Sequence, residues 1–241
     1  NLKDEFIPTK QDHSIYKSKY CKFIFRNYFN PSYSQENLLS FPLGYKSGFW
    51  SSYSNKSKLI AQRNNTRKYL WSFAGTTKKS GRAKSISNLK PLTPYYIHST
   101  SGWNTSDSLT TLEYRDLMLN SQFTPSFRGA CNLECYRTYE ALESGSIPIL
   151  QRYSHIQNYD FYNLWYGDNH PLLLVDDLFD KNSEYNGKAR PSPQAYNIIN
   201  SYCSDKEKLS LLRQETCSWW SSYKNNLKNK VSSIYRNIFN F

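Results

Sequence analysis

The sequence predicts an α/β fold with a parallel sheet, on three observations. Residues 121–149 have the pattern of a strand, a loop, a helix and a second strand, which is the repeating unit of such sheets. Residues 171–175 form a short continuous apolar run, as expected for a central parallel strand. Apolar side chains recur every three or four positions over residues 206–239, which predicts a long helix or a kinked pair of helices.

The unit at residues 121–149 is the most informative part of the chain. We expect a strand over residues 121–124, a loop over 125–132 and a helix over 133–143. Gly145 stands where a helix needs a left-handed residue to end it, and a buried strand should begin at residue 147. Units of this type bind ligands at the carboxyl ends of their strands, beside helix N-termini.

Further elements are expected on both sides of this unit. Strands are predicted at residues 21–28, 37–44, 68–74 and 95–98, and helices at residues 81–89, 110–119 and 193–203. Residues 47–67 are polar and lack periodicity, so they are interpreted as a linker. The predicted organisation is the end of an N-terminal domain over residues 1–60, a complete Rossmann-like domain over residues 61–205 and a C-terminal helix over residues 206–241.

The composition favours a folded protein with a basic surface. Of the 241 residues, 38% are hydrophobic and 17% are aromatic, which is enough aromatic area for a core. The net charge of +12 fits nucleic acid, an anionic membrane or a nucleotide diphosphate, but dispersed basic residues most often form a solvated surface. Five cysteines permit one disulfide and require none. The chain begins with Asn1 and shows no signal peptide, so we expect a processed product or a fragment.

A resemblance to a known family rests on residues of the same unit. The matching residues are Ser121, Phe123, Thr124, Gly129, Arg137, Glu140, Ala141, Gly145, Ile147, Pro148 and Ile149. In this pattern the chain resembles glycosyltransferases of the exostosin type, glycosyltransferase family 47. Within that family it is most similar, through residues 134–141, to the ribitol xylosyltransferases of dystroglycan glycan synthesis. Weaker likeness extends to residues 41–44, 71–76 and 219–230.

The resemblance implies a GT-B-like glycosyltransferase with one Rossmann-like donor-binding domain and a partial N-terminal domain. Such an enzyme moves a sugar from a nucleotide sugar, here a UDP-sugar, to a hydroxyl of a glycan or glycoprotein acceptor with inversion. The nucleotide sugar is its donor substrate, and no further cofactor is implied. A membrane is expected only through an N-terminal anchor outside these residues. The Golgi lumen would then be the location in a eukaryote, and the cytoplasm otherwise.

Glu140 is the sharpest candidate for a binding residue. A carboxylate can accept hydrogen bonds from both hydroxyls of a ribose, and in the resembling enzymes the matching Glu holds the ribose of the nucleotide. Alternatively, Glu140 binds no ligand and is either a solvent-exposed acid on the helix or an ion-pair partner for Arg137. Arg137 precedes Glu140 by three residues and shares its helix face. Arg137 is therefore a local ion-pair partner, a diphosphate ligand or a brace that orients Glu140.

The loop before this helix and a basic residue upstream complete the predicted site. Gly129 and its neighbours Arg128 to Asn132 should direct backbone N–H groups towards a helix start, which is the geometry of anion capture. Arg82 either approaches the diphosphate, as in the resembling enzymes, or belongs to a basic helix surface. No catalytic base can be assigned, and no Asp-x-Asp or other metal-binding motif occurs in the sequence.

Two other functions remain open on the sequence. Positive charge and abundant aromatic residues fit a nucleic-acid-binding module, but no such motif occurs and the basic residues do not interleave with aromatics in one block, so nucleic acid is not the favoured partner. Since no base is assigned, a non-catalytic transferase-like domain that serves as a binding partner is the other alternative. Binding of UDP, UDP-sugars and single-stranded RNA across salt concentrations discriminates among them.

Overall fold

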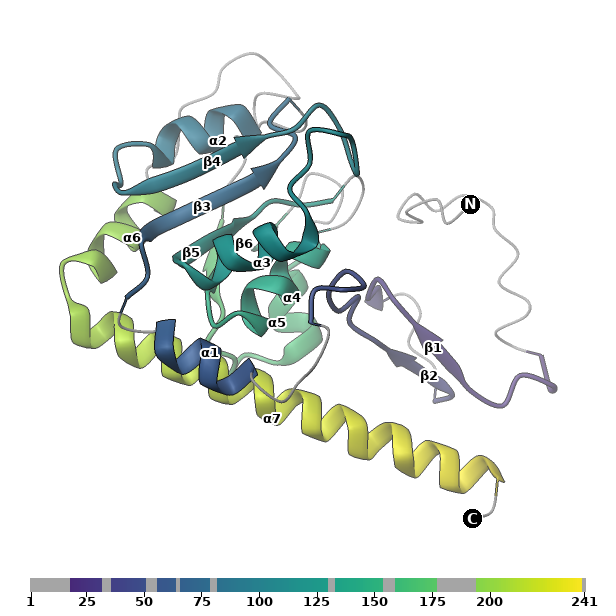
Figure 1. Ribbon diagram of the computed structural model, residues 1–241. Helices are drawn as coiled ribbons and strands as arrows, with labels where there is room; N and C mark the ends of the chain where they lie inside the picture. Colours follow the sequence, from purple (N-terminus) through teal and green to yellow (C-terminus); the bar gives the residue numbers. More distant parts are fainter. Residues whose placement is uncertain are drawn as a thin grey trace.

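The computed structural model describes residues 18–31, 36–50, 56–63, 66–78, 82–129, 133–153, 159–176 and 194–239. Its strands are β1 (Ile24–Arg26), β2 (Leu38–Ser40), β3 (Tyr69–Gly75), β4 (Tyr95–Ser99), β5 (Ser121–Ser126), β6 (Ile147–Gln151) and β7 (Leu173–Val175). Its helices are α1 (Lys56–Arg63), α2 (Arg82–Leu89), α3 (Thr111–Leu119), α4 (Tyr136–Glu143), α5 (Phe161–Tyr166), α6 (Gln194–Cys203) and α7 (Lys206–Phe239). Figure 1 shows helices packed around the sheet and the long helix α7 extending past it.

A five-stranded parallel sheet forms the centre of the fold, in the order β4-β3-β5-β6-β7. Every neighbouring pair is parallel, with Phe123 opposite both Trp71 and Ile147. The chain runs from β3 outwards to β4, returns past β3 to β5, and then continues to β6 and β7. The direction of winding therefore reverses between β3 and β5. The predicted α/β class with a parallel sheet is confirmed.

One face of the sheet is apolar and is covered by α2 and α6. Alternate strand residues such as Trp71, Phe73 and Phe123 point to this face, where they pack with Ile86 of α2 and Ile199 of α6 in one buried cluster. All five of these side chains are buried. Burial of these apolar side chains stabilises the packing of α2 and α6 on the sheet.

On the opposite face, under α3 and α4, strands β3 and β5 carry small hydroxyl-bearing residues, whereas Leu150 of β6 packs with Tyr139 and Leu142 of α4. The hydroxyl of Ser121 donates to that of Ser72 at 2.6 Å. Ser126 and Thr138 of α4 are joined by another hydroxyl pair at 2.7 Å. These four buried hydroxyls therefore have partners, which offsets the cost of burying them. Small side chains also leave room for α4 to lie close to the sheet, so the N-terminal end of α4 is held near the end of β5.

The predicted unit at residues 121–149 is confirmed as β5-α4-β6, with two shifted boundaries. Strand β5 includes residues 125 and 126, which were predicted as loop, and α4 begins at residue 136 instead of 133. The predicted start was wrong because Leu133 leaves the helix pattern to pack in a core cluster with Tyr162. Gly145 ends the helix with φ of +64°, as predicted.

The interpretation of residues 47–67 as a linker was wrong. Phe49 and Trp50 are buried in a core cluster with Met118, and residues 56–63 form α1. None of the described residues of α1 is fully buried, so its sequence carries no continuous apolar stripe. Helix α1 is held instead by contacts with other parts of the chain, including an ion pair between Lys56 and Glu143 of α4.

Other corrections concern the ends of the sheet and the N-terminal strands. The run at residues 171–175 was predicted as a central strand, but among the described strands β7 pairs only with β6 and lies at the edge. The strands predicted at residues 21–28 and 37–44 are three-residue strands that form a separate parallel pair, β1-β2. Helix α5 was not predicted. The proposed domain boundaries stay a prediction.

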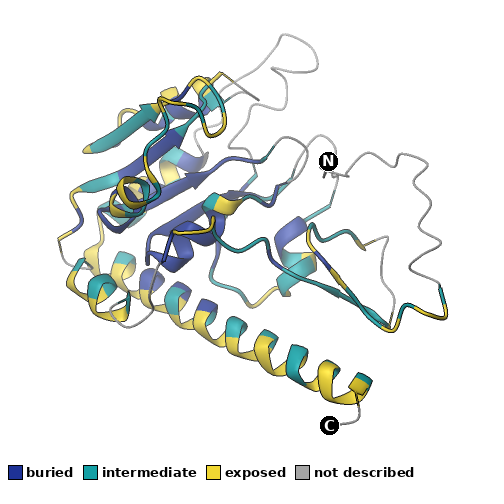
Figure 2. Ribbon diagram, turned by 45° about the vertical axis from the view of Figure 1, so that its right-hand side comes forward, coloured by how far each residue is buried: buried dark blue, intermediate teal, exposed yellow. Residues whose placement is uncertain are grey.

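Helix α7 is one continuous helix of 34 residues, about 50 Å long. Its first half is anchored to the domain, with Leu212, Thr216 and Trp220 buried. In Figure 2 the central strands of the sheet are mostly dark blue, whereas the second half of α7 is teal and yellow, which marks partial or full exposure. No helix in the described part of the chain is both long enough and apolar enough to cross a membrane.

Candidate functional site

A cavity of about 650 Å³ lies at the carboxyl ends of β3 and β5. Ala74 and Gly75 line it from the end of β3, Phe127 and Gly129 line it after β5, and Tyr136 lines it from the start of α4. In doubly wound sheets, ligands bind outside the carboxyl ends of the strands where the strand order reverses. Because the reversal here falls between β3 and β5, this space, termed the switch-point cavity, is the candidate site.

The structure brings most of the predicted site residues together. Those that line the switch-point cavity are Arg82, Gly129, Arg137 and Glu140. Arg128 is buried, with 7% of its surface exposed, but it is not among the lining residues. Asn132 lies outside the described residues. Four residues separated by up to 58 positions (82 to 140) therefore meet at one cavity, although they come from α2, the loop after β5 and α4.

Glu140 is a buried carboxylate on the cavity side of α4. Only 4% of its surface is exposed, which excludes the alternative of a solvated helix acid. Its Oε1 accepts the backbone N–H of Lys46 at 3.2 Å. Burial raises the pKa of Glu140 above its usual value, while the Lys46 N–H and the charge of Arg137 act in the opposite direction. A ligand that donates hydrogen bonds would stabilise the charged form further.

Arg137 crosses from α4 to the end of β3. Its Nη2 donates to the backbone carbonyl of Ala74 at 3.0 Å, and its guanidinium lies 4.6 Å from the centre of the Phe73 ring. It also attracts Glu140, and the hydroxyl of Tyr114 interacts with both side chains. Arg137 therefore places positive charge both near Glu140 and at the cavity.

Arg82, at the start of α2, joins the two loops that border the cavity. Its Nη1 donates to the carbonyl of Thr76 after β3 at 3.1 Å, and its Nη2 donates to the carbonyl of Arg128 after β5 at 2.7 Å. Burial and the neighbouring charge of Arg137 lower the pKa of Arg82 to about 10. Arg82 is therefore not part of a solvated helix surface. The guanidinium groups of Arg82 and Arg137 together create a positive electrostatic potential at the cavity, which would favour the binding of an anion.

Two buried N–H groups at the cavity lack an acceptor among the described residues, as do the Nε groups of five other arginines. The Nε of Arg82 and the Nε of Arg137 are buried, and no acceptor in the described ranges of the chain satisfies either. A buried donor without a partner costs about 1–3 kcal/mol. Oxygen atoms of a bound anion are the simplest acceptors for such groups.

Glu134 is a titratable lining residue that the sequence did not single out. Its carboxylate accepts the backbone N–H groups of Leu43 at 2.7 Å and Tyr28 at 3.2 Å, and the hydroxyl of Tyr139 donates to it at 2.5 Å. Burial raises its pKa to about 7 in spite of these donors. Glu134 thus ties the N-terminal segment to the loop before α4. No local sequence signal marks this role, because its partners lie about 90 and 105 residues away.

Aromatic residues occupy the outer rim of the cavity. Trp103 is 70% exposed and stacks on Tyr136 with the ring centres 6.1 Å apart. The ammonium group of Lys46 lies 5.9 Å from the centre of the Trp103 ring and donates to Asn104 at 3.0 Å. An exposed aromatic face beside a cation is a suitable surface for a planar ring, such as a nucleobase.

The described part of the chain has no cluster of side chains suited to a metal ion. Within the described ranges, no three His, Cys, Asp or Glu side chains are grouped so that they could hold a metal ion. His98 lines the cavity, and its Nε2 is 2.7 Å from the carbonyl of Asp107. The arrangement around the cavity is therefore one of guanidinium groups, two buried carboxylates and exposed aromatic rings.

Comparison with known proteins gives a family and three relatives. The model of the family described as "RXYLT1 C-terminal domain" matches residues 50–176, which contain β3 to β7 and all six predicted site residues. The chain is 24% identical to ribitol-5-phosphate xylosyltransferase 1 of Homo sapiens over 239 residues, which is 91% of this chain and 49% of the human protein. It is 24% identical to the Mus musculus protein of that name over 55% of this chain and 30% of the relative. For the Danio rerio protein the identity is 27%, over 55% of this chain and 31% of the relative.

Proposed function

Since the chain belongs to the family of the RXYLT1 C-terminal domain, we propose that it is the nucleotide-sugar-binding part of a glycosyltransferase. The relatives that it matches are named as xylosyltransferases, and the chain spans about half of the human one and less than a third of the other two. The proposed enzyme is exostosin-like and has the GT-B arrangement, in which two domains face a cleft. It transfers a sugar, with xylose as the first candidate, from a UDP-sugar to a glycan hydroxyl.

One observation carries this proposal. Arg82, Arg137 and Glu140 converge on a cavity at the switch point of a parallel sheet. This is where doubly wound folds bind nucleotides. A nucleoside diphosphate has two ribose hydroxyls that donate hydrogen bonds and a diphosphate that accepts them, so its polarity is complementary to a carboxylate beside two guanidinium groups.

We assign the ribose to Glu140 and the diphosphate to Arg82 and Arg137. The buried carboxylate of Glu140 would accept hydrogen bonds from the ribose hydroxyls, and the two unsatisfied Nε–H groups would donate to phosphate oxygens. The uracil ring would stack on the exposed face of Trp103. Gly129 would let the backbone approach the phosphates, because it carries no side chain.

In the proposed transfer, the two guanidinium groups would assist the departure of the diphosphate. A bond forms between the acceptor hydroxyl oxygen and the anomeric carbon, on the face opposite the leaving group. The bond from that carbon to the diphosphate breaks, and its electron pair leaves with the UDP. A general base takes the proton of the acceptor hydroxyl. Negative charge grows on the departing diphosphate, so guanidinium groups already fixed at that point stabilise the transition state more than the ground state.

A matched pair of variants on one helix tests the ribose assignment. Glu140→Gln should weaken UDP binding about tenfold or more in calorimetry, because the charged acceptor is lost. Glu143→Gln, three residues further along α4, is the control. Glu143 is equally buried but does not line the cavity, and its contacts are with Lys56, Trp220 and Lys224. Its variant should therefore lose stability and still bind UDP as the wild type does. Equal affinities for all three proteins would remove Glu140 from the site.

A second pair tests the diphosphate assignment. Arg82→Gln should weaken UDP binding while affecting uridine much less, because uridine has no phosphate. Lys90→Gln, an exposed cation just beyond the end of α2, should change neither affinity. If single-stranded RNA bound with a steep salt dependence and UDP did not bind, the protein would be a nucleic-acid-binding module instead.

A further inference from the structure

The loop that follows β4 carries Trp103 and Asn104 to the rim of the switch-point cavity. One carboxylate ties the two sides of this loop together. Asp107 accepts the backbone N–H of Ser101 at 2.6 Å and the hydroxyl of Thr105 at 2.5 Å. Trp103 and Asn104 lie between these two donors in the sequence, so the loop presents them from an anchored stretch of chain.

The amide of Asn104 is oriented by Lys46. Asn104 has a left-handed backbone conformation with φ of +55°, which asparagine adopts more readily than most residues with a side chain. Its side chain is exposed, and its Oδ1 accepts a hydrogen bond from the Nζ of Lys46 at 3.0 Å. An ammonium group only donates, so it favours the orientation with Oδ1 towards Lys46. The Nδ2 group is then directed to the other side.

Lys46 connects this amide to the residue that we assign to the ribose. Its backbone N–H donates to Oε1 of Glu140 at 3.2 Å, and its ammonium lies 5.9 Å from the centre of the Trp103 ring. In a nucleotide the base is bonded directly to the ribose. A base that stacks on Trp103 beside a ribose at Glu140 would therefore present its polar edge near Asn104.

We propose that Asn104 selects uracil over cytosine in the bound nucleotide, and that Lys46 is the positioning residue that fixes its amide. The proposal rests on the function proposed above and adds the residue that decides which base is accepted. Uracil has an N–H at position 3 between two carbonyl oxygens. Oδ1 of Asn104 would accept from that N–H, while Nδ2 would donate to one of the oxygens.

Cytosine fails because its edge has the opposite polarity. Its position 3 is an acceptor and its position 4 is an amino donor. With the amide held as in this structure, acceptor would face acceptor. Turning the amide over would restore the match, but it would point the Nδ2 donors of Asn104 at the ammonium of Lys46. Specificity here therefore comes from a repulsive element as well as from an attractive one.

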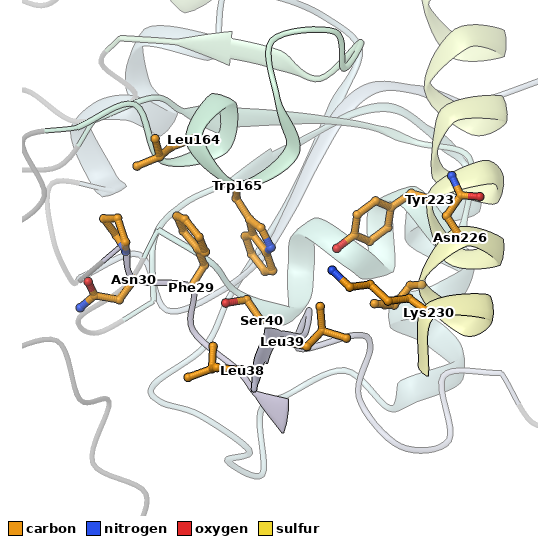
Figure 3. Close-up of a pocket in the computed structure, with 12 residues that line it drawn as sticks. Phe29, Asn30, Leu38, Leu39, Ser40, Leu164, Trp165, Tyr223, Asn226 and Lys230 are labelled. Carbon is orange, nitrogen blue, oxygen red and sulfur yellow. The ribbon is translucent and has the colours of Figure 1, made fainter. Parts of the chain in front are cut away.

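A second cavity, of about 560 Å³, is the competing place for a nucleobase. It lies between the segment of β1 and β2, helix α5 and helix α7, and we term it the α7 groove. Figure 3 shows Trp165 on one side of the groove and Lys230 of α7 on the other. Phe29 stacks on Trp165 with the ring planes 7° apart. None of the described residues that line the groove is an arginine, so it lacks the guanidinium pair that the switch-point cavity offers to a diphosphate.

The ratio of two dissociation constants on one protein tests the proposal. Calorimetry should give a Kd for CDP about tenfold higher than that for UDP, as expected for one bidentate contact. Asn104→Asp should lower this ratio to about one or below, because a carboxylate has no donor for a uracil carbonyl and accepts from the amino group of cytosine. UDP and CDP share their ribose and diphosphate, so a loss of folded protein would not change the ratio.

Lys46→Met tests the positioning role and keeps the backbone N–H that Glu140 accepts. The ratio should fall to about twofold, because the amide is then free to suit either base. Lys46→Arg, which retains a donor-only cation, should keep most of the discrimination. The control is Lys68→Met. Lys68 also lies close to an aromatic ring, 5.1 Å from the centre of Tyr69, but it does not line the cavity, so the ratio should stay at the wild-type value.

Two tryptophans report where the nucleotide binds. The chain contains six tryptophans, so a ¹⁵N-labelled sample of the full chain gives six indole N–H signals. The variants Trp103→Phe and Trp165→Phe assign the signals of the switch-point cavity and of the α7 groove. Titration with UDP should shift the Trp103 signal and leave the Trp165 signal in place.

Each result decides between defined alternatives. Equal Kd values for UDP and CDP in the wild type, or an unchanged ratio in Asn104→Asp or in Lys46→Met, would overturn the proposal for this loop. Those results would leave the proposed function intact if UDP still moved the Trp103 signal. Failure of UDP to bind, or a shift confined to Trp165, would contradict the proposed function itself.

Discussion

Gly75 and Arg137 approach each other so closely that a side chain at position 75 would displace the guanidinium of Arg137. A Cβ atom on residue 75 would lie 2.9 Å from Nη2 of Arg137, and Gly75 has a φ of +140°. The approach is required because Arg137 donates to the carbonyl of Ala74, the preceding residue. The end of β3 therefore needs glycine both for its backbone conformation and for the position of the guanidinium group.

Gly75→Ala is expected to weaken UDP binding about tenfold or more. The new methyl group would move the guanidinium of Arg137 away from Ala74 and from the proposed diphosphate position. Calorimetric titration with UDP measures this effect. The control is Gly167→Ala, because Gly167 also has a positive φ of +80° but has no atom within 4 Å of the added Cβ. Both variants should lose stability, and only the first should lose affinity; equal affinities would contradict the role of Gly75.

Glu143 is expected to be essential for the attachment of α7. Its carboxylate accepts the indole N–H of Trp220 at 2.6 Å and pairs with Lys224 at 2.7 Å and with Lys56 of α1. Glu143→Gln leaves two lysines without their buried counter-charge, which should lower the free energy of unfolding by about 3 kcal/mol in urea denaturation. Glu215→Gln, at an exposed position of α7, should change it by about 0.5 kcal/mol at most. A similar small change in both would show that the network contributes little.

The stability of the protein should depend on pH through Glu134. Its pKa is about 7 in the folded protein, compared with 4.5 as the usual value. The folded state therefore holds this proton more tightly than the unfolded state, so the contribution is full below pH 4.5 and is lost as the pH rises through 7. The expected loss is roughly 3 kcal/mol, from about 1.4 kcal/mol for each pKa unit. Urea denaturation at pH 4.5, 6 and 8 measures the free energy of unfolding of the wild type and of Glu134→Gln. If that free energy changed with pH in the same way for both proteins, Glu134 would not be the source of the pH dependence.

Binding of UDP is expected to continue without divalent metal. In the proposed site the diphosphate charge is met by Arg82, Arg137 and backbone N–H groups near Gly129. Calorimetry with excess EDTA should therefore give a Kd within about twofold of the value in manganese, because EDTA removes none of the proposed contacts to the diphosphate. Loss of binding in EDTA and its recovery on addition of manganese would show that a metal ion carries the diphosphate.

Local pattern was sufficient for the elements that have a strong periodicity or a clear end signal. The strand at residue 121, the helix that ends before Gly145 and the strand after it were predicted within a few residues, as was the full length of α7. These segments carry their signals in consecutive residues: Gly145 at the end of α4, an apolar run at β6, and apolar residues at every third or fourth position of α7. The pattern failed at residues 47–67, where Phe49 and Trp50 are buried by Met118, which is far away in the chain.

The sequence by itself determined the class of fold and the residues that carry charge to the site, because periodicity and the matching motif both reside in short stretches of chain. Only the tertiary structure decided that Arg82, Arg137 and Glu140 share one cavity, because the sheet order places the ends of β3 and β5 together. It also decided the roles of Gly75 and Glu134 and the existence of the α7 groove. Each of these depends on atoms that are distant in sequence and meet only after the sheet and α7 have packed.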